Sequence, residues 1–236
     1  MYAKFSKEKP VLSKLRHDVS SKLALGVPLT FDFLKEQYKE YRSPKDKISR
    51  LTIDGDLIRL KKGLYLPVSD NTREFQTLAL IANQMLGPSY VSLETALSYY
   101  GLIPEKVCSI RSVTTKRSKK FTNPLGQFEY LSAKNNYFSI GIKQVMLNDI
   151  SFLIASPEKA ICDMIVMTAS IKIQSAKAMR EYIEEDMRID IDEFNLQADK
   201  PSTCSQPDMS IFDKVLETGL KRREIGFLKE YFNNAK

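Results

Sequence analysis

The residues that could carry chemistry in this chain form a sparse set of catalytic types and a dense set of basic side chains. The sparse set holds the usual catalytic groups: among 236 residues there is a single histidine, His17, and three widely separated cysteines. Any Ser-His-Asp, Cys-His or two-histidine metal mechanism would therefore have to use His17. That histidine lies about half a helical turn from the apolar stripe of a helix expected over residues 11–25. We expect it at the helix surface, outside any active site.

Other catalytic and cofactor-binding motifs are absent from the sequence. It has no P-loop, no G-x-G-x-x-G and no G-x-S-x-G. It also lacks an acidic residue followed two positions later by lysine, the pair that a restriction-type nuclease would place on a strand. The cysteines form no C-x-x-C pair, which argues against a disulfide framework and a structural zinc site. We therefore expect a binding protein that is not an enzyme, with no metal and no cofactor.

The dense set consists of basic side chains, concentrated in one part of the chain. The sequence has 36 Lys and Arg against 29 Asp and Glu, a formal net charge of +7. Residues 1–70 contain 15 basic and 9 acidic side chains, residues 71–150 contain 9 and 5, and residues 151–236 contain 12 and 15. This asymmetry predicts two domains with different partners, of which the first binds a polyanion. The polar stretch Pro67–Thr72 suggests a boundary between domains of residues 1–70 and 71–236.

Capping and turn residues predict three helices in the first domain. The first spans residues 11–25. The second begins after Thr30, a favourable N-cap. The third begins at Ser43-Pro44, a cap followed by proline at the first helical position, and ends at Gly55.

A hairpin is predicted after the third helix. Two short apolar segments, residues 57–60 and 64–66, flank Lys61-Lys62-Gly63, whose glycine can take the positive φ of a tight turn. Three helices followed by a basic hairpin is the order of a winged helix-turn-helix. In that fold the third helix enters the major groove of DNA and the wing lies along the backbone.

The outer face of the third helix and the hairpin turn would then contact DNA. Ile48 and Leu51 mark the buried side of the helix, which leaves Ser49 and Arg50 facing away. Arg50 is the best candidate for a guanine edge, because a bidentate arginine contact contributes about 1–3 kcal/mol of discrimination. Other basic residues suit phosphates. The predicted DNA-binding residues are Arg42, Ser43, Lys45, Lys47, Ser49, Arg50, Arg59, Lys61 and Lys62. The alternative is a protein-binding winged helix with ordinary solvated charges.

Residues 71–236 predict a second domain, which makes the chain α+β overall. Helices are expected over residues 75–86 and after the cap Ser92. A period-two pattern predicts strands at residues 107–115, 127–132, 137–142 and 150–155, which we combine into an antiparallel sheet over about 105–155. Residues 156–236 are expected to be helical, with helices beginning near 156, 175, 208 and 221.

Two charged segments of the second domain could bind partners. A basic group on a strand end and the loop after it could hold RNA, DNA or an acidic protein surface: Arg111, Lys116, Arg117, Lys119 and Lys120. Residues 181–193 are acidic and could bind a basic protein. Either segment could also be an ordinary solvated surface. Because no apolar run approaches the roughly 18 residues of a membrane span, we expect a cytoplasmic protein without membrane contact.

Several short motifs, taken in order, resemble one known family. They are Gly63-Leu64-Tyr65-Leu66-Pro67, Tyr90-Val91-Ser92, residues 96–104, residues 112–117, residues 126–130, and Ile154-Ala155-Ser156-Pro157-Glu158-Lys159-Ala160 leading to Asp163. Their order resembles that of the AbiEi-type antitoxins of bacterial type IV, or abortive-infection, toxin-antitoxin systems. The resemblance covers residues 30–163.

The resemblance implies a two-module antitoxin. In such proteins the winged domain binds repeats in the promoter of its own operon and represses it. The second domain opposes a nucleotidyltransferase toxin encoded beside it. Two copies on paired half-sites are expected, since each chain has one winged module. The alternatives are a ligand-sensing transcription factor and a nucleic-acid enzyme guided by the winged helix.

Overall fold

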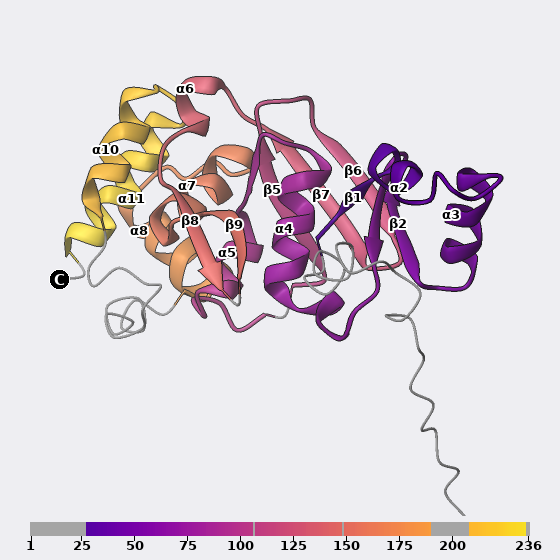
Figure 1. Ribbon diagram of the computed structural model, residues 1–236. Coiled ribbons are helices and arrows are strands. Elements are labelled where there is room, and N and C mark those ends of the chain that lie inside the picture. Colours follow the sequence, from indigo (N-terminus) through magenta and orange to yellow (C-terminus); the bar gives the residue numbers. More distant parts are fainter. Residues whose placement is uncertain (1–26, 106, 148, 190–207, 235–236) are drawn as a thin grey trace, which may run out of the picture. The chain divides into compact units, whose positions relative to one another are not determined.

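The computed structural model describes residues 27–105, 107–147, 149–189 and 208–234, which are of mixed α+β type (Figure 1). They form two compact units that divide between Thr77 and Leu78, inside helix α4 (Phe75–Met85) and after the predicted boundary. The helix predicted over residues 11–25, with His17, lies outside the described residues. None of the described helices is both long enough and apolar enough to cross a membrane.

The helices predicted after Thr30 and Ser43 are confirmed. Helix α2 (Phe31–Gln37) begins where the Thr30 hydroxyl accepts a hydrogen bond from the Phe33 N–H at 3.3 Å. Helix α3 (Pro44–Ile53) begins where the Ser43 hydroxyl accepts from the Asp46 N–H at 3.4 Å. Each cap satisfies a backbone donor that the first helical turn leaves unpaired.

The predicted hairpin is also confirmed, and a third short strand joins it. Strands β2 (Leu57–Lys61) and β3 (Leu64–Pro67) pair across a turn in which Gly63 has φ +79°. Strand β1 (Leu29–Thr30) pairs with β3, so these described strands form a sheet in the order β1-β3-β2. A 3-10 turn, η2 (Asp70–Arg73), follows. One core holds the unit together, built from Leu29, Leu34, Tyr38, Ile48 and Leu57.

The second unit is built on a mixed sheet, which corrects the predicted antiparallel one. Its described strands are β4 (Ser89–Val91), β5 (Ser109–Thr114), β6 (Lys119–Asn123), β7 (Gly126–Ser132), β8 (Ile142–Leu147) and β9 (Ile150–Ala155). They lie in the order β6-β7-β5-β4-β9-β8. Strand β5 runs parallel to β7, and β4 runs parallel to β9, while the other neighbours are antiparallel.

Burial explains why β7 lies between β5 and β6. Strand β7 buries Phe128 and Tyr130, whereas Lys119 and Lys120 of β6 are exposed. The apolar strand therefore takes the interior position and the lysine-bearing strand takes the edge, where charge also discourages pairing with other chains. Period-two spacing identifies strands but does not give this order.

The strand predicted over residues 137–142 is wrong. Residues Asn135–Phe138 form the short helix α6, and β8 begins only at Ile142. Gly141, with φ +63°, turns the chain between them. The helical turn lets the buried Tyr137 side chain reach toward the following helix layer, a tertiary requirement that local spacing does not encode.

The predicted helical end is confirmed in its described part. Beyond α5 (Leu93–Tyr99), the helices are α7 (Pro157–Met167), α8 (Ala176–Glu181) continuing as a π-helical turn (Tyr182–Asp186), α10 (Met209–Glu217) and α11 (Arg222–Asn234). Ser156, Ser175 and Asp208 cap three of them through side-chain hydrogen bonds. Figure 1 shows α4 across one face of the sheet and α8, α10 and α11 grouped beside α7.

Gly141 offers a test of this packing. A Cβ at this position would lie 2.8 Å from the Cβ of Lys159, whereas at Gly219, with φ +75°, it would meet nothing within 4 Å. Gly219→Ala should cost about 1–2 kcal/mol through its backbone conformation alone. Gly141→Ala should cost about 1–3 kcal/mol more, because overpacking adds to the same penalty. Urea denaturation of both variants measures the difference, and equal losses would contradict the close packing at Gly141.

Candidate functional site

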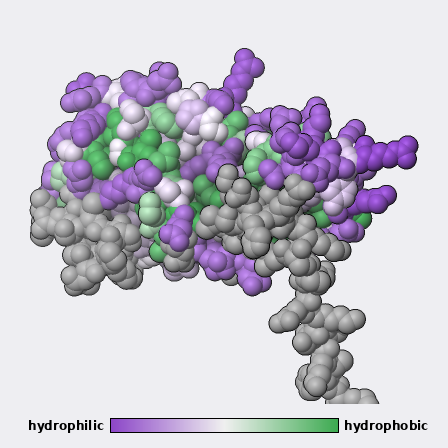
Figure 2. Space-filling view, viewed as in Figure 1, coloured by the Kyte–Doolittle hydropathy of each residue, from purple (hydrophilic) through white to green (hydrophobic). Residues whose placement is uncertain are grey.

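Helix α3 presents a polar and basic outer face. Ile48 is 1% exposed and anchors the helix to its unit, while Lys45, Ser49 and Arg50 are exposed. Hydrophilic residues dominate the surface over α3, at the right of Figure 2. The side of the helix that was expected to face away from the core therefore does so.

The β2–β3 turn carries the second basic group. Arg59 and Lys62 are exposed, and Lys61 is half-buried. The N–H of Phe31 donates to the carbonyl of Gly63 at 2.9 Å, which ties the turn to the start of α2. Since α3 and β2 also pack on one core, both basic groups belong to a single compact body.

Most of these cations have no acidic partner within the described residues. The side chains without an ion pair there are Arg42, Lys45, Arg50, Arg59 and Lys62. Lys47 instead lies over the ring of Tyr41, with its Nζ 5.4 Å from the ring centroid. Uncommitted basic side chains on one body are available for phosphates or base edges.

The net charge of this region is smaller than its total suggests. Residues 1–26 contribute six basic and two acidic side chains, and residues 27–70 contribute nine and seven. Most of the excess therefore falls outside the described part of the unit. The DNA hypothesis depends on where its basic side chains lie rather than on their number.

Ile53, at the end of α3, was not singled out from the sequence, yet it is 81% exposed. Apolar spacing favours placing an isoleucine of this helix toward the core. Ile53 follows Ile48 by five positions, which puts it about 140° around the helix axis from that buried side chain. This angle is the sequence signal that could have placed Ile53 on the outer face of α3.

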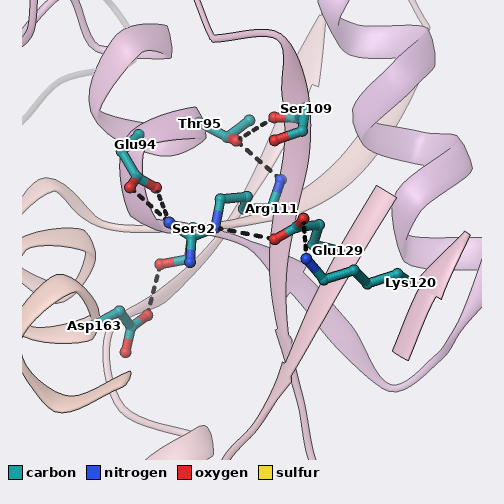
Figure 3. Close-up of polar contacts among 8 residues, drawn as sticks. All are labelled: Ser92, Glu94, Thr95, Ser109, Arg111, Lys120, Glu129 and Asp163. Atoms are coloured by element: carbon teal, nitrogen blue, oxygen red, sulfur yellow. Dashed lines mark hydrogen bonds and ion pairs between the residues drawn. The ribbon is translucent and has the colours of Figure 1, made fainter. Parts of the chain in front are cut away.

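In the second unit, the structure divides the predicted basic face. Arg111, from the interior strand β5, has its Nη1 2.6 Å from Glu94 Oε1 and its Nε 3.7 Å from Glu129 Oε2 (Figure 3). Lys120 also pairs with Glu129, at 2.7 Å. The charge of Arg111 is thus committed within the fold, on an interior strand rather than in the exposed loop.

The other predicted residues lie on the exposed strand β6 and in the loop before it. Lys119 lies over the ring of Phe121, with Nζ 4.9 Å from its centroid. Lys116 and Arg117 are exposed and form no ion pair with a described acid. These two cations, in the β5–β6 loop, are the members most available to a partner, and their role stays a prediction.

A buried polar cluster surrounds Asp163 on α7. Its carboxylate accepts from the Ser92 hydroxyl at 2.6 Å, the Tyr137 hydroxyl at 2.6 Å and the Tyr90 hydroxyl at 3.1 Å. Lys159 Nζ lies 3.1 Å from the same carboxylate and donates to the Tyr137 carbonyl at 3.1 Å. Both charged side chains are fully buried. Figure 3 shows the contact between Ser92 and Asp163.

The cluster departs from the prediction at Ser92. This residue has the extended backbone of an N-cap, but its side chain makes no capping hydrogen bond and turns to Asp163 instead. The next residue, Leu93, has φ 56°, a conformation that L side chains rarely adopt. The Ser92 side chain therefore contacts Asp163 on α7 instead of capping the helix that begins after it.

Burial shifts the titration of the cluster. It raises the pKa of the Tyr90 and Tyr137 hydroxyls well above their ordinary value, and the nearby Asp163 charge adds to the effect. Burial also lowers the pKa of Lys159, although the attraction of Asp163 opposes this. The hydroxyls thus remain protonated donors to Asp163 to a higher pH than exposed tyrosines would.

A hollow of about 570 Å³ lies beside the Arg111 network. Its wall combines apolar side chains with charged groups from the network, from Glu105 and from Asp186. The apolar lining residues are Leu97, Ile103, Val107, Met164 and Met187. Among the described residues, no group of three or more His, Cys, Asp and Glu is arranged to hold a metal ion.

Comparisons with known proteins give no identification: no family model matches the chain, and no curated protein matches it.

The Asp163 cluster predicts a large and specific stability effect. Asp163→Ala should cost about 3–5 kcal/mol in the free energy of unfolding, because it leaves the buried Lys159 ammonium unpaired. Lys120→Ala is the control, since its ion pair with Glu129 involves a lysine side chain that is 75% exposed. Such a surface pair contributes about 0–1 kcal/mol. Urea denaturation distinguishes the two, and similar small losses would contradict the role given to Asp163.

Proposed function

We propose that this protein is a DNA-binding autorepressor and antitoxin. A winged helix-turn-helix in the first unit binds repeats in the promoter of its own operon. The second unit opposes a nucleotidyltransferase toxin encoded beside it, through direct contact or otherwise. Two copies bind paired half-sites, and the protein has no catalytic role.

The observation that carries the DNA-binding part is the group of uncommitted cations on α3 and the β2–β3 turn. Arg50 projects from the outer face of α3, and Lys62 from the turn, on one packed body. In a winged helix-turn-helix these two elements face the major groove and the adjacent backbone. The phosphate groups of DNA would be the negatively charged partners that these side chains lack among the described residues.

The antitoxin part is supported by the resemblance to AbiEi-type antitoxins. Its motifs are far apart in sequence, but Tyr90, Ser92 and Asp163 meet in one buried cluster. Two of the motifs, Tyr90-Val91-Ser92 and the segment leading to Asp163, therefore form one buried cluster in this chain, which supports the resemblance. The exposed cations Lys116 and Arg117 are the candidates for the surface of the second unit that acts against the toxin.

The DNA-binding part is tested by a mobility-shift titration of the full chain on a duplex from upstream of its own gene. Arg50→Ala should weaken binding about tenfold or more, through loss of a base contact. Lys61→Ala/Lys62→Ala should weaken binding and make it less dependent on salt, because phosphate contacts release counterions.

The matched control is Lys172→Ala/Lys214→Ala, which removes two exposed lysines from the second unit. It makes the same change in net charge as the turn variant and should leave the affinity within about twofold at moderate salt. Unchanged binding by both Arg50→Ala and the turn variant would reject this docking.

The antitoxin part is tested by co-expression with the neighbouring gene. Induction of a nucleotidyltransferase toxin should arrest growth, and the full chain should restore it. Lys116→Ala/Arg117→Ala should reduce this rescue while retaining promoter binding. Arg50→Ala should weaken promoter binding while retaining the rescue. Failure of the wild-type chain to restore growth would exclude the antitoxin role.

One observation favours a second candidate, a ligand-sensing transcription factor. The hollow beside Arg111 has a volume within the range of small-molecule sites and a mostly apolar wall. In this case the adjacent gene would encode a metabolic protein or transporter rather than a nucleotidyltransferase. Gene context therefore separates the two candidates directly.

A further inference from the structure

Helix α3 carries three side chains in one row on its outermost face. Asp46, Arg50 and Ile53 follow one another at intervals of four and three residues, which places them above one another on a helix. All three are exposed, and the buried Ile48 lies on the opposite side. The row therefore combines an acid, a base and an apolar group.

Ile53 is not part of the core that the described residues of its unit form. With 81% of its surface exposed, it contributes little to the core that Ile48 and Leu57 build. An apolar side chain in this position gains free energy only when something apolar covers it.

Arg50 indicates what covers Ile53. It lies one helical turn before Ile53, and elsewhere on the unit Arg42, Lys45 and Lys62 also lack an acidic partner among the described residues. These cations complement a polyanion, and double-stranded DNA has one apolar group on its major-groove edges, the C5-methyl of thymine.

Asp46 indicates which part of the DNA the row meets. An acid in the row opposes a path along the phosphates. At base edges the same side chain can accept a hydrogen bond from the N4 amine of cytosine. The row thus suits the floor of the major groove better than the backbone.

We infer that Ile53 determines sequence specificity by packing against the C5-methyl of a thymine next to the guanine bound by Arg50. Residues three apart in a helix are separated by about 4.5 Å along its axis. Since base pairs are about 3.4 Å apart, the guanine and the thymine lie within one or two base pairs of each other. This inference rests on the proposed DNA-binding function and adds its base preference.

The experiment begins with the full chain and a randomised library of DNA duplexes. Duplexes retained by the wild-type chain are sequenced, and each thymine of the preferred site is replaced in turn by uracil, which removes only the methyl group. At one position near a preferred guanine, uracil should weaken wild-type binding about threefold to tenfold. Ile53→Ala should bind the thymine duplex correspondingly less well and show no further loss with uracil.

Two variants serve as references. Arg50→Ala should lose the guanine preference and retain the uracil effect. Met146→Ala removes another strongly exposed apolar side chain, 72% exposed and in the second unit, and should behave as the wild type.

The outcomes separate this inference from the function on which it rests. If the wild-type chain retains no preferred duplex, the DNA-binding proposal fails and the inference with it. If Arg50→Ala loses the guanine preference but every uracil effect persists in Ile53→Ala, the inference alone is overturned. If Ile53→Ala changes self-association in sedimentation and leaves DNA binding intact, Ile53 is a contact between copies and the inference is likewise overturned.

Discussion

The buried carboxylate of Asp163 is the constraint around which the second unit is arranged. An ionised side chain at zero exposure costs several kcal/mol unless its lone pairs are satisfied. Three hydroxyl groups and one ammonium group meet this need, and they come from β4, the following helix start, α6 and α7 itself. Each donor requires its own element to lie at a defined place, so one carboxylate fixes the mutual positions of several elements.

This constraint explains features that appear to depend on neighbouring residues but result from contacts with residues distant in sequence. Ser92 gives up a helix-capping hydrogen bond to reach Asp163, and Leu93 accepts an unusual backbone conformation beside it. Gly141 has no side chain because Lys159 occupies the adjacent space. Burial and the nearby charge raise the pKa values of the two tyrosine hydroxyls, which extends the pH range in which they donate to Asp163. The motifs that contain Tyr90, Ser92 and Lys159 thus belong to one polar core.

Helix α3 and the β2–β3 turn of the first unit differ from the paired cations of the second unit. In the second unit, Arg111, Lys120 and Lys159 are each paired with an acid, so their charge contributes to the fold. On α3 and the β2–β3 turn, Lys45, Arg50 and Lys62 have no acidic partner among the described residues, and Ile53 is exposed on the same helix as Lys45 and Arg50. Paired charges stabilise the fold, whereas unpaired exposed charges are available to bind a charged partner.

The sequence by itself determined the elements whose signals are local. Thr30, Ser43-Pro44 and Ser156-Pro157 mark helix starts, and Gly63 marks the hairpin turn, because caps and tight turns depend on neighbouring residues alone. It also placed Arg50 on the outer face of α3, since helical periodicity suffices for that. The tertiary structure decided the strand order, the helical turn at Tyr137, the pairing of Arg111 with Glu94 and the gathering of donors around Asp163. These depend on contacts between residues up to 73 positions apart, which no local spacing encodes.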